Sequence, residues 1–245
     1  MNYLLSIAYD GSGFCGWQRL PNARTVQGVI EQALTKMLRE TITIDGAGRT
    51  DAGVHALNQT ATFQTTKPIT AEQLAYALNH FLPSDISIEK VNAAADDFHA
   101  RYSAVGKRYG YKLFISPVQR PFQERYESRI KEALDEGRVR EAMCYFCGRH
   151  DFKALMASGS HVKDTIRTIS KFELDRQGDS WYFGIEGDGF LYHMVRIIIG
   201  TLIDIGRGRI EPNQVPMIIE SGQRHMAKRT APANGLYLEN VFYDV

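Results

Sequence analysis

The sequence lacks any uninterrupted apolar run that approaches the ~18 residues needed to span a membrane. The first ten residues contain no basic region and already include an acidic residue, so they do not resemble a secretory signal. There is also no low-complexity stretch and no linker rich in Pro, Gly and Ser. We therefore expect a cytoplasmic protein that does not contact a membrane, built as one large or two small domains.

Cysteine is scarce, since Cys15, Cys144 and Cys147 are the only three. An odd, small number fits a reducing compartment. Cys144 and Cys147 form a C-x-x-C, but no second pair follows at the spacing of a zinc site. The pair falls within an apolar helical pattern, so we predict buried core thiols rather than a redox or metal site. The sequence thus predicts no metal site.

Net charge is almost absent, because 29 Lys and Arg residues face 28 Asp and Glu residues, giving +1. Such a balance does not indicate nucleic-acid binding, which would have to depend on local basic patches. The candidate patches are Arg19 with Arg24, Lys107 with Arg108, Arg207 with Arg209, and residues 224–229. Taken singly, each of them is more typical of a solvated surface.

Hydrophobic periodicity predicts a mixture of strands and helices in both halves of the chain. The first half has predicted strands at 3–9, 42–47, 60–65 and 86–91, and predicted helices at 26–38, capped by Thr25, and from the capping box at 70–73. The second half has predicted strands at 109–115, 166–174, 181–186 and 238–243, and predicted helices at 138–147 and 191–205, the latter capped by Gly206. This order predicts an α+β fold with two parts, residues 1–103 and 104–245.

Residues 11–16 spell a literal G-x-G-x-x-G after the first predicted strand. A dinucleotide site would need a helix to begin at once, and Pro21 prevents a helix from running through this segment. An oxidoreductase is therefore a weak alternative, which NAD-dependent thermal stabilisation would reveal.

The most informative stretch is residues 48–56, in which Asp51 stands among small residues, with Arg49 two positions before it. The small residues leave room for a bulky molecule, and a guanidinium nearby keeps a carboxylate ionised. We therefore predict a loop that presents a reactive Asp51 to a substrate. For a shorter motif, an ordinary Asp/Gly turn would be the better interpretation.

The longer string resembles the catalytic motif of pseudouridine synthases, most closely that of the tRNA pseudouridine synthase A (TruA) family. Further matching stretches cover almost the whole chain, in the family's order: 9–18, 97–104, 107–111, 150–152 with 165–169, 190–200, and 235–238. The departures are mild, since Tyr192 and Ile197 stand where family members often carry His and Asn.

The resemblance implies two related ferredoxin-like α+β halves that form a central antiparallel sheet flanked by helices, with the active site in the cleft between them. It implies isomerisation of uridine to pseudouridine at positions 38, 39 and 40 of the tRNA anticodon stem-loop, by a homodimer without a cofactor. A non-catalytic RNA-binding or chaperone protein on this fold is the alternative, and the intact Asp51, Tyr109 and Arg196 argue against it.

The resemblance also assigns roles to residues of the active site. Asp51 is the catalytic carboxylate, as a nucleophile on the ribose or the base or as a base, and these alternatives stay open. Arg196 pairs with it, although an arginine near a helix end can instead hold a carbonyl group. Tyr109 and Leu236 pack on the two faces of the uracil, with ordinary core packing as the alternative for both.

The remaining roles concern the RNA. Arg49 enters the space that the flipped-out base leaves behind. Five cations are expected to contact phosphates, namely Lys107, Arg108, Arg224, Lys228 and Arg229. His55 lies close to Asp51 in the sequence, and we predict that it is structural.

Overall fold

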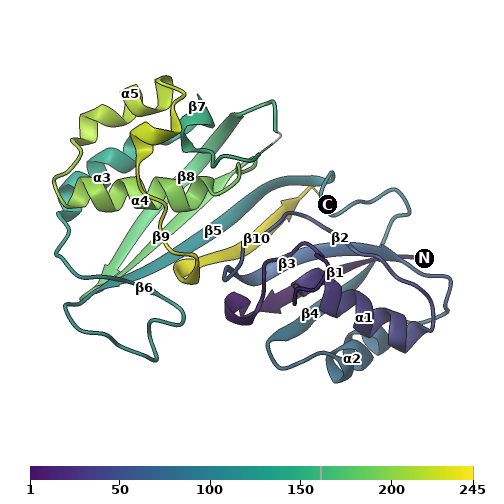
Figure 1. The fold of residues 1–245 in the computed structure, drawn as a ribbon. Helices are drawn as coiled ribbons and strands as arrows, with labels where there is room; N and C mark the ends of the chain where they lie inside the picture. The colour runs from purple at the N-terminus through teal and green to yellow at the C-terminus, as the bar shows by residue number, and fades with distance from the viewer. Residues whose placement is uncertain (161, 245) are drawn as a thin grey trace. The chain divides into compact units, whose positions relative to one another are not determined.

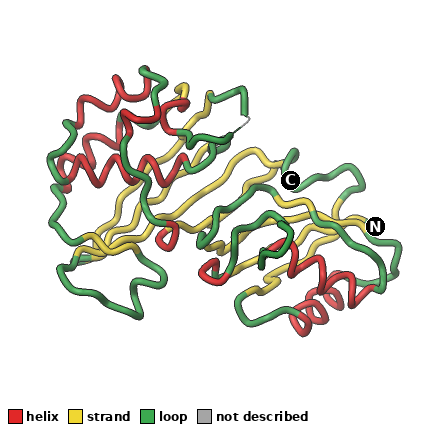
Figure 2. Tube along the Cα trace, viewed as in Figure 1, coloured by secondary structure: helices red, strands yellow, loops and turns green. Residues whose placement is uncertain are grey.

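The computed structural model describes residues 1–160 and 162–244. These residues form two compact units: unit 1 contains residues 1–105 and the segment from 237 onward, and unit 2 contains residues 106–236 (Figure 1). The predicted division between 103 and 104 left the last strand in the second part, whereas this strand belongs to unit 1. Both units combine strands and helices (Figure 2), as the predicted α+β class requires.

The sheet of unit 1 has the strand order β4-β1-β3-β10, with β2 also beside β3. Its strands are β1 (Asn2–Tyr9), β2 (Asp45–Gly46), β3 (His55–Gln64), β4 (Ile86–Ala94) and β10 (Leu236–Tyr243). β1 pairs antiparallel with both β3 and β4, but β10 runs parallel to β3, with Tyr237 opposite His55. A long connection permits parallel pairing, and β10 follows all of unit 2 in the chain.

Two helices, α1 (Val26–Leu38) and α2 (Ala71–Phe81), lie beside the strands of unit 1 in Figure 1. The predicted caps are confirmed: the Thr25 hydroxyl accepts a hydrogen bond from the Gly28 backbone N–H at 3.3 Å, and Thr70 and Gln73 form a capping box. Residues 11–13 form a single 3-10 turn, and no α-helix begins before Val26. The dinucleotide interpretation of the glycine motif is therefore wrong.

Unit 2 contains β5 (Ala104–Ile115), β6 (Ser128–Ile130), β7 (Gly148–Asp151), β8 (Ile166–Gln177) and β9 (Ser180–Gly187). The order β5-β9-β8-β7 is antiparallel, whereas β6 runs parallel to β5 after a long loop. The helices are α3 (Glu136–Cys144), α4 (Met194–Gly206) and α5 (Val215–Glu220). The α+β class is confirmed, but β6 and β10 make the strand pairing mixed rather than wholly antiparallel.

Two local predictions in unit 2 are wrong. Cys144 and Cys147 are exposed, because α3 ends at Cys144 and buries Val139, Ala142 and Met143 instead. Gly206 is the last residue of α4 rather than its cap, and the left-handed residue is Gly208, with φ +73°. Within the described residues, none of the helices has both the length and the apolar character needed to cross a membrane.

Candidate active site

Asp51 lies in the loop between β2 and β3, and residues 46–54 are called the Asp51 loop below. Asp51 is half-buried, whereas Arg49 is exposed. The entry to the loop is fixed from β3, where the Ala47 N–H donates to the Thr60 carbonyl and the Gln59 side chain donates to the Gly48 carbonyl, both at 2.8 Å. The backbone that leads into Asp51 is therefore held by β3.

Residues 9–18, called the opening segment, fasten the loop from the other side. The Trp17 N–H donates to the Thr50 carbonyl at 3.0 Å, and the Gly53 N–H donates to the Phe14 carbonyl at 3.3 Å. The Tyr9 hydroxyl lies 2.8 Å from the Thr50 hydroxyl, and burial raises the pKa of Tyr9, so this group stays protonated. Asp51 is thus flanked on both sides by residues whose backbone is pinned.

Gly16 makes this fastening possible. Its φ is +91°, and a Cβ there would lie 2.7 Å from the Thr50 carbonyl oxygen and 3.2 Å from the Asp51 carbonyl carbon. Only glycine combines this backbone conformation with such a close approach. Gly16 therefore allows the opening segment to pack directly against the backbone of the Asp51 loop. Sequence analysis recognised this segment as a family signature but did not find its structural role.

The two other predicted residues around this loop have distinct surroundings. The Arg49 Nε–H donates to the Gln18 side-chain oxygen at 3.0 Å, so the guanidinium is oriented by the opening segment. His55 is buried, its Nδ1 accepts the Gly11 N–H at 3.1 Å, and its ring stacks on Tyr237 with centroids 4.8 Å apart. The His55 ring is thus held between the backbone of the opening segment and the Tyr237 ring.

Unit 2 contributes the aromatic candidate. Tyr109 lies on β5 opposite Ile185, is 8% exposed, and meets the ring of Phe190 edge-on at 5.1 Å. Two residues further along the strand, the Tyr111 hydroxyl lies 2.7 Å from the Ser128 hydroxyl and donates to the Pro232 carbonyl at 3.0 Å. Burial raises the pKa of Tyr111, which therefore stays protonated in the core.

Arg196 stands in the first turn of α4 and is half-buried. Its Nε–H donates to the Ala231 carbonyl at 2.8 Å, and the Ala231 N–H donates back to the Arg196 carbonyl at 2.9 Å. One contact of the Arg196 side chain is thus the alternative considered above, in which the arginine binds a backbone carbonyl group. Leu236, at the start of β10, is 6% exposed, so the core-packing alternative also fits it.

The five predicted phosphate-binding cations fall into two groups. On β5, Lys107 is half-buried and the Arg108 guanidinium contacts the carboxylates of Glu173 and Glu186. The others belong to residues 224–231, called the basic segment, where Lys228 and Arg229 are exposed and Arg224 donates to the Thr230 hydroxyl at 2.8 Å. Burial lowers the pKa of Arg224.

The basic segment packs closely on α4. A Cβ at Gly200 would lie 2.5 Å from the Arg229 carbonyl oxygen. The Thr201 hydroxyl lies 3.3 Å from the Ala227 carbonyl, to which it donates, and Ala231 is tied to Arg196 as described above. The helix therefore fixes the backbone of the segment while two of its cations face solvent.

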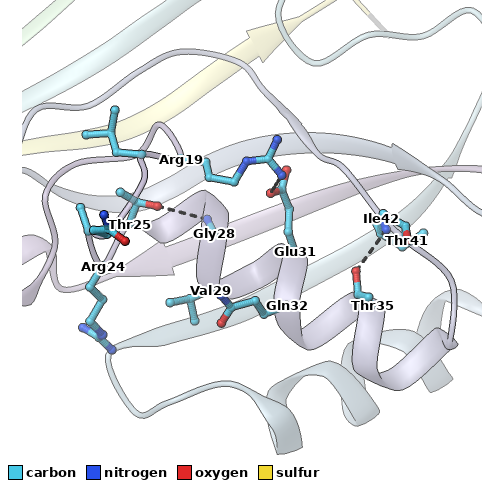
Figure 3. Close-up of a pocket in the computed structure, with 13 residues that line it drawn as sticks. Arg19, Arg24, Thr25, Gly28, Val29, Glu31, Gln32, Thr35, Thr41 and Ile42 are labelled. Atoms are coloured by element: carbon cyan, nitrogen blue, oxygen red, sulfur yellow. Dashed lines mark hydrogen bonds and ion pairs between the residues drawn. The ribbon is translucent and has the colours of Figure 1, made fainter.

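A separate pocket of about 760 Å³ lies alongside α1 (Figure 3). Its lining includes Arg19, Arg24, Thr25 and Glu31, and residues 46–54 do not line it. Its two arginines are already paired, with Arg19 2.8 Å from Glu31 and Arg24 2.8 Å from Asp85. Across residues 1–160 and 162–244, no cluster of three or more His, Cys, Asp or Glu side chains has the arrangement of a metal site.

Comparison with known proteins places these features in context. A family model described as tRNA pseudouridine synthase matches residues 5–103 and 142–244. A tRNA pseudouridine synthase A of Acetivibrio thermocellus is 46% identical over 242 residues, covering 99% of both chains. The tRNA pseudouridine synthase A of Caldicellulosiruptor bescii is 43% identical with the same coverage, and tRNA pseudouridine synthase A 2 of Clostridium tetani is 41% identical over 245 residues, covering 99% of both chains.

Proposed function

The chain belongs to the tRNA pseudouridine synthase family, and we propose that it isomerises uridine to pseudouridine at positions 38, 39 and 40 of the tRNA anticodon stem-loop. The observation that carries the proposal is the Asp51 loop. A half-buried carboxylate stands among small residues, on a backbone fastened by β3 and by the opening segment. Such fixation suits a group that must meet one atom of a bound nucleotide.

The reaction needs no net oxidation and no transferred group. The bond between uracil N1 and ribose C1′ breaks, the base turns, and C5 bonds to C1′. The C5 proton leaves to solvent and N1 gains a proton, so atoms and electrons balance. Asp51 supplies the carboxylate that reacts with the ribose or the base, or that takes a ribose proton.

The other residues are proposed to bind and orient the RNA. Arg49 fills the space left by the flipped base, which offsets part of the unstacking cost. Tyr109 and Leu236 pack against the uracil, and Arg196 supplies the positive charge that keeps a carboxylate ionised. Phosphate contacts are proposed for five cations: Lys107, Arg108, Arg224, Lys228 and Arg229.

The proposed enzyme is a cytoplasmic homodimer. Light scattering of the purified protein should give about twice the chain mass of 27.7 kDa. A monomer that is active would contradict this part of the proposal and leave the reaction unaffected.

The function is tested with unmodified tRNA transcripts and the purified protein. Pseudouridine is mapped by carbodiimide modification and primer extension after incubation. We expect new stops at positions 38–40, and none in a matched transcript with cytidine at these positions. Pseudouridine elsewhere in the tRNA would overturn the position assignment, and none at all would overturn the activity.

A further inference from the structure

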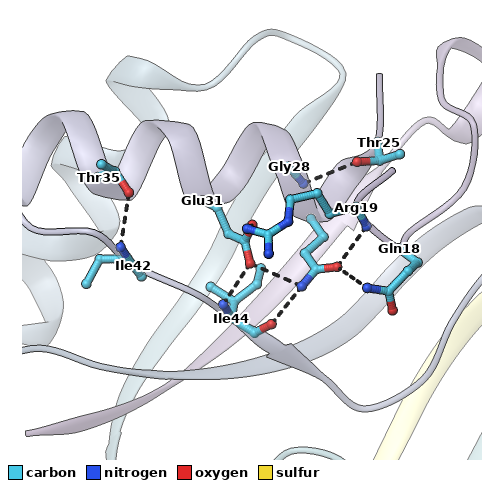
Figure 4. A network of polar contacts seen from close by, with 9 residues as sticks. Gln18, Arg19, Thr25, Gly28, Glu31, Thr35, Ile42 and Ile44 are labelled. Carbon is cyan, nitrogen blue, oxygen red and sulfur yellow. Dashed lines mark hydrogen bonds and ion pairs between the residues drawn. The ribbon is translucent and has the colours of Figure 1, made fainter. Parts of the chain in front are cut away.

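A row of four polar side chains runs from the interior of unit 1 to the Asp51 loop. In order, its members are Glu31 and Gln27 on α1, Gln18 in the opening segment, and Arg49 in the Asp51 loop. Glu31 and Gln27 are buried, whereas Gln18 and Arg49 are exposed. We call this row the glutamine relay, and Figure 4 shows its inner part around α1.

The buried carboxylate of Glu31 fixes the first orientation. One of its oxygens accepts the Ile44 N–H and the Gln27 side-chain N–H, both at 3.1 Å, and the other accepts from Arg19 at 2.8 Å. An ionised carboxylate only accepts hydrogen bonds, so the amide nitrogen of Gln27 must face it. The same nitrogen also donates to the Ile44 carbonyl at 3.1 Å.

The orientation then passes along the row. With its nitrogen toward Glu31, Gln27 directs its oxygen to the opening segment, where it accepts the Arg19 backbone N–H at 2.9 Å and the Gln18 side-chain N–H at 3.0 Å. The Gln18 side-chain nitrogen therefore faces Gln27, and the Gln18 side-chain oxygen faces the other way and accepts the Arg49 Nε–H at 3.0 Å. Reversing either amide would set N–H against N–H or oxygen against carboxylate.

We propose that Glu31, Gln27 and Gln18 are positioning residues, which orient the Arg49 guanidinium within the Asp51 loop from a carboxylate buried on α1. The contacts with Gln27 and with Arg49 require the same orientation of the Gln18 amide, so the orientation set from the inner end of the row is the one that accepts the Arg49 Nε–H. The role given to Arg49 in RNA rests on the proposed function, whereas the orientation of Arg49 in the free protein does not.

The first test uses the free protein. Solvent exchange of the Arg49 Nε–H is measured by NMR in wild type, Gln18→Met and Gln27→Met. Thr35→Val is the matched control. The Thr35 hydroxyl accepts the Ile42 N–H at 3.1 Å, so it also connects α1 to the segment before β2, but it is not part of the glutamine relay. We expect faster exchange in both glutamine variants and no change in Thr35→Val. Unchanged exchange in Gln18→Met overturns the proposal.

Gln27→Met removes one of the three donors to Glu31 and the side-chain donor to the Ile44 carbonyl, so it lowers stability by itself. Gln18→Met changes an exposed residue and keeps the test valid if Gln27→Met does not fold. A thermal melt of each variant shows whether faster exchange at Arg49 comes from lower stability of the whole protein or from the loss of the hydrogen bond alone.

The second test asks whether the row acts through Arg49. Base flipping is followed by the fluorescence of 2-aminopurine placed next to the target uridine in an anticodon stem-loop. We expect Gln18→Met to slow flipping about fivefold, as the loss of one modest hydrogen bond allows. In an Arg49→Ala background the same substitution should have no further effect. Equal slowing in both backgrounds overturns the proposal.

The two tests also separate this proposal from the proposed function. If wild type forms no pseudouridine in tRNA, the function fails, while Arg49 exchange still reports on the row. If pseudouridine forms and the exchange of the Arg49 Nε–H does not change in Gln18→Met, the positioning role of the glutamine relay is overturned and the proposed function stands.

Discussion

The Asp51 loop in unit 1 and the basic segment in unit 2 are both held by close packing of their backbone against a glycine. Each presses its backbone against a glycine, Gly16 for the loop and Gly200 for the segment. The loop is held on two sides and leaves its carboxylate half-buried, whereas the segment is held on α4 and leaves Lys228 and Arg229 exposed. A reacting group needs one fixed position, while a phosphate contact needs mainly a charge at the surface.

The largest effect is expected from Asp51→Asn, which keeps the size of the side chain and removes its charge. Turnover, measured by tritium release from C5-labelled uridine in tRNA, should fall by several orders of magnitude, while tRNA affinity stays within about tenfold. Asp45→Asn is the control, since this carboxylate is 71% exposed in the same unit. A folded Asp51→Asn protein that keeps a tenth of wild-type activity would refute the catalytic role.

Gly16→Ala should damage both stability and activity, because it combines a left-handed backbone with a Cβ 2.7 Å from the Thr50 carbonyl. We expect a loss of about 2–3 kcal/mol in the free energy of unfolding. Gly178→Ala is the matched control, since φ is +64° there and no atom lies within 4 Å of the added Cβ. Gly178→Ala should lower the free energy of unfolding by about 1 kcal/mol. Urea denaturation measures the free energy of unfolding of both variants. Equal losses would show that the fastening of the loop contributes nothing.

Gly200→Ala tests the basic segment in the same way. Helix propensity alone favours alanine by about 1 kcal/mol. The Cβ would lie 2.5 Å from the Arg229 carbonyl oxygen, so we expect destabilisation and a several-fold weaker affinity for tRNA. A more stable variant with unchanged affinity, seen in a thermal melt and a filter-binding assay, would show that the segment adapts freely.

The cations of the two groups should differ in their salt dependence. Lys228→Ala should lower the slope of log affinity against log salt by about one, as the loss of one phosphate contact does. Arg108→Gln should lower it less, because Glu173 and Glu186 already engage this guanidinium. Filter binding over a range of salt concentrations measures both slopes. Equal slopes would mean that Arg108 leaves these carboxylates when RNA binds.

The smallest effect concerns pH. Hydrogen bonds from Lys171 and Arg108 lower the pKa of Glu173, so its contribution is present at neutral pH and is lost as pH falls through the lowered pKa. Wild type should therefore lose more stability than Glu173→Gln as the pH falls below the ordinary glutamate pKa of about 4.3. The effect is small because the pair is partly exposed. Thermal melts across this range measure it, and parallel curves would contradict it.

Local patterns in the sequence predicted much of this architecture because they depend on nearby residues. The helix after Thr25 and the capping box at Thr70 follow from spacing and capping chemistry alone. The cysteine prediction was wrong because α3 ends at Cys144, so the helical spacing that placed Cys147 on the buried face does not continue to it. A signal for the glutamine relay was present, since Gln27 and Glu31 stand four residues apart on the apolar side of α1.

By itself, the sequence determined most of the succession of helices and strands and placed Asp51 in a loop, because these depend on short-range spacing. It did not predict the short elements β6, β7 and α5. Only the tertiary structure decided that β10 returns to unit 1 parallel to β3, that Gly16 bears against the Asp51 loop, and that Arg108 meets two carboxylates. These contacts join residues far apart in the chain. Their partners are chosen by packing and by the need of buried polar groups for hydrogen bonds, which no local pattern encodes.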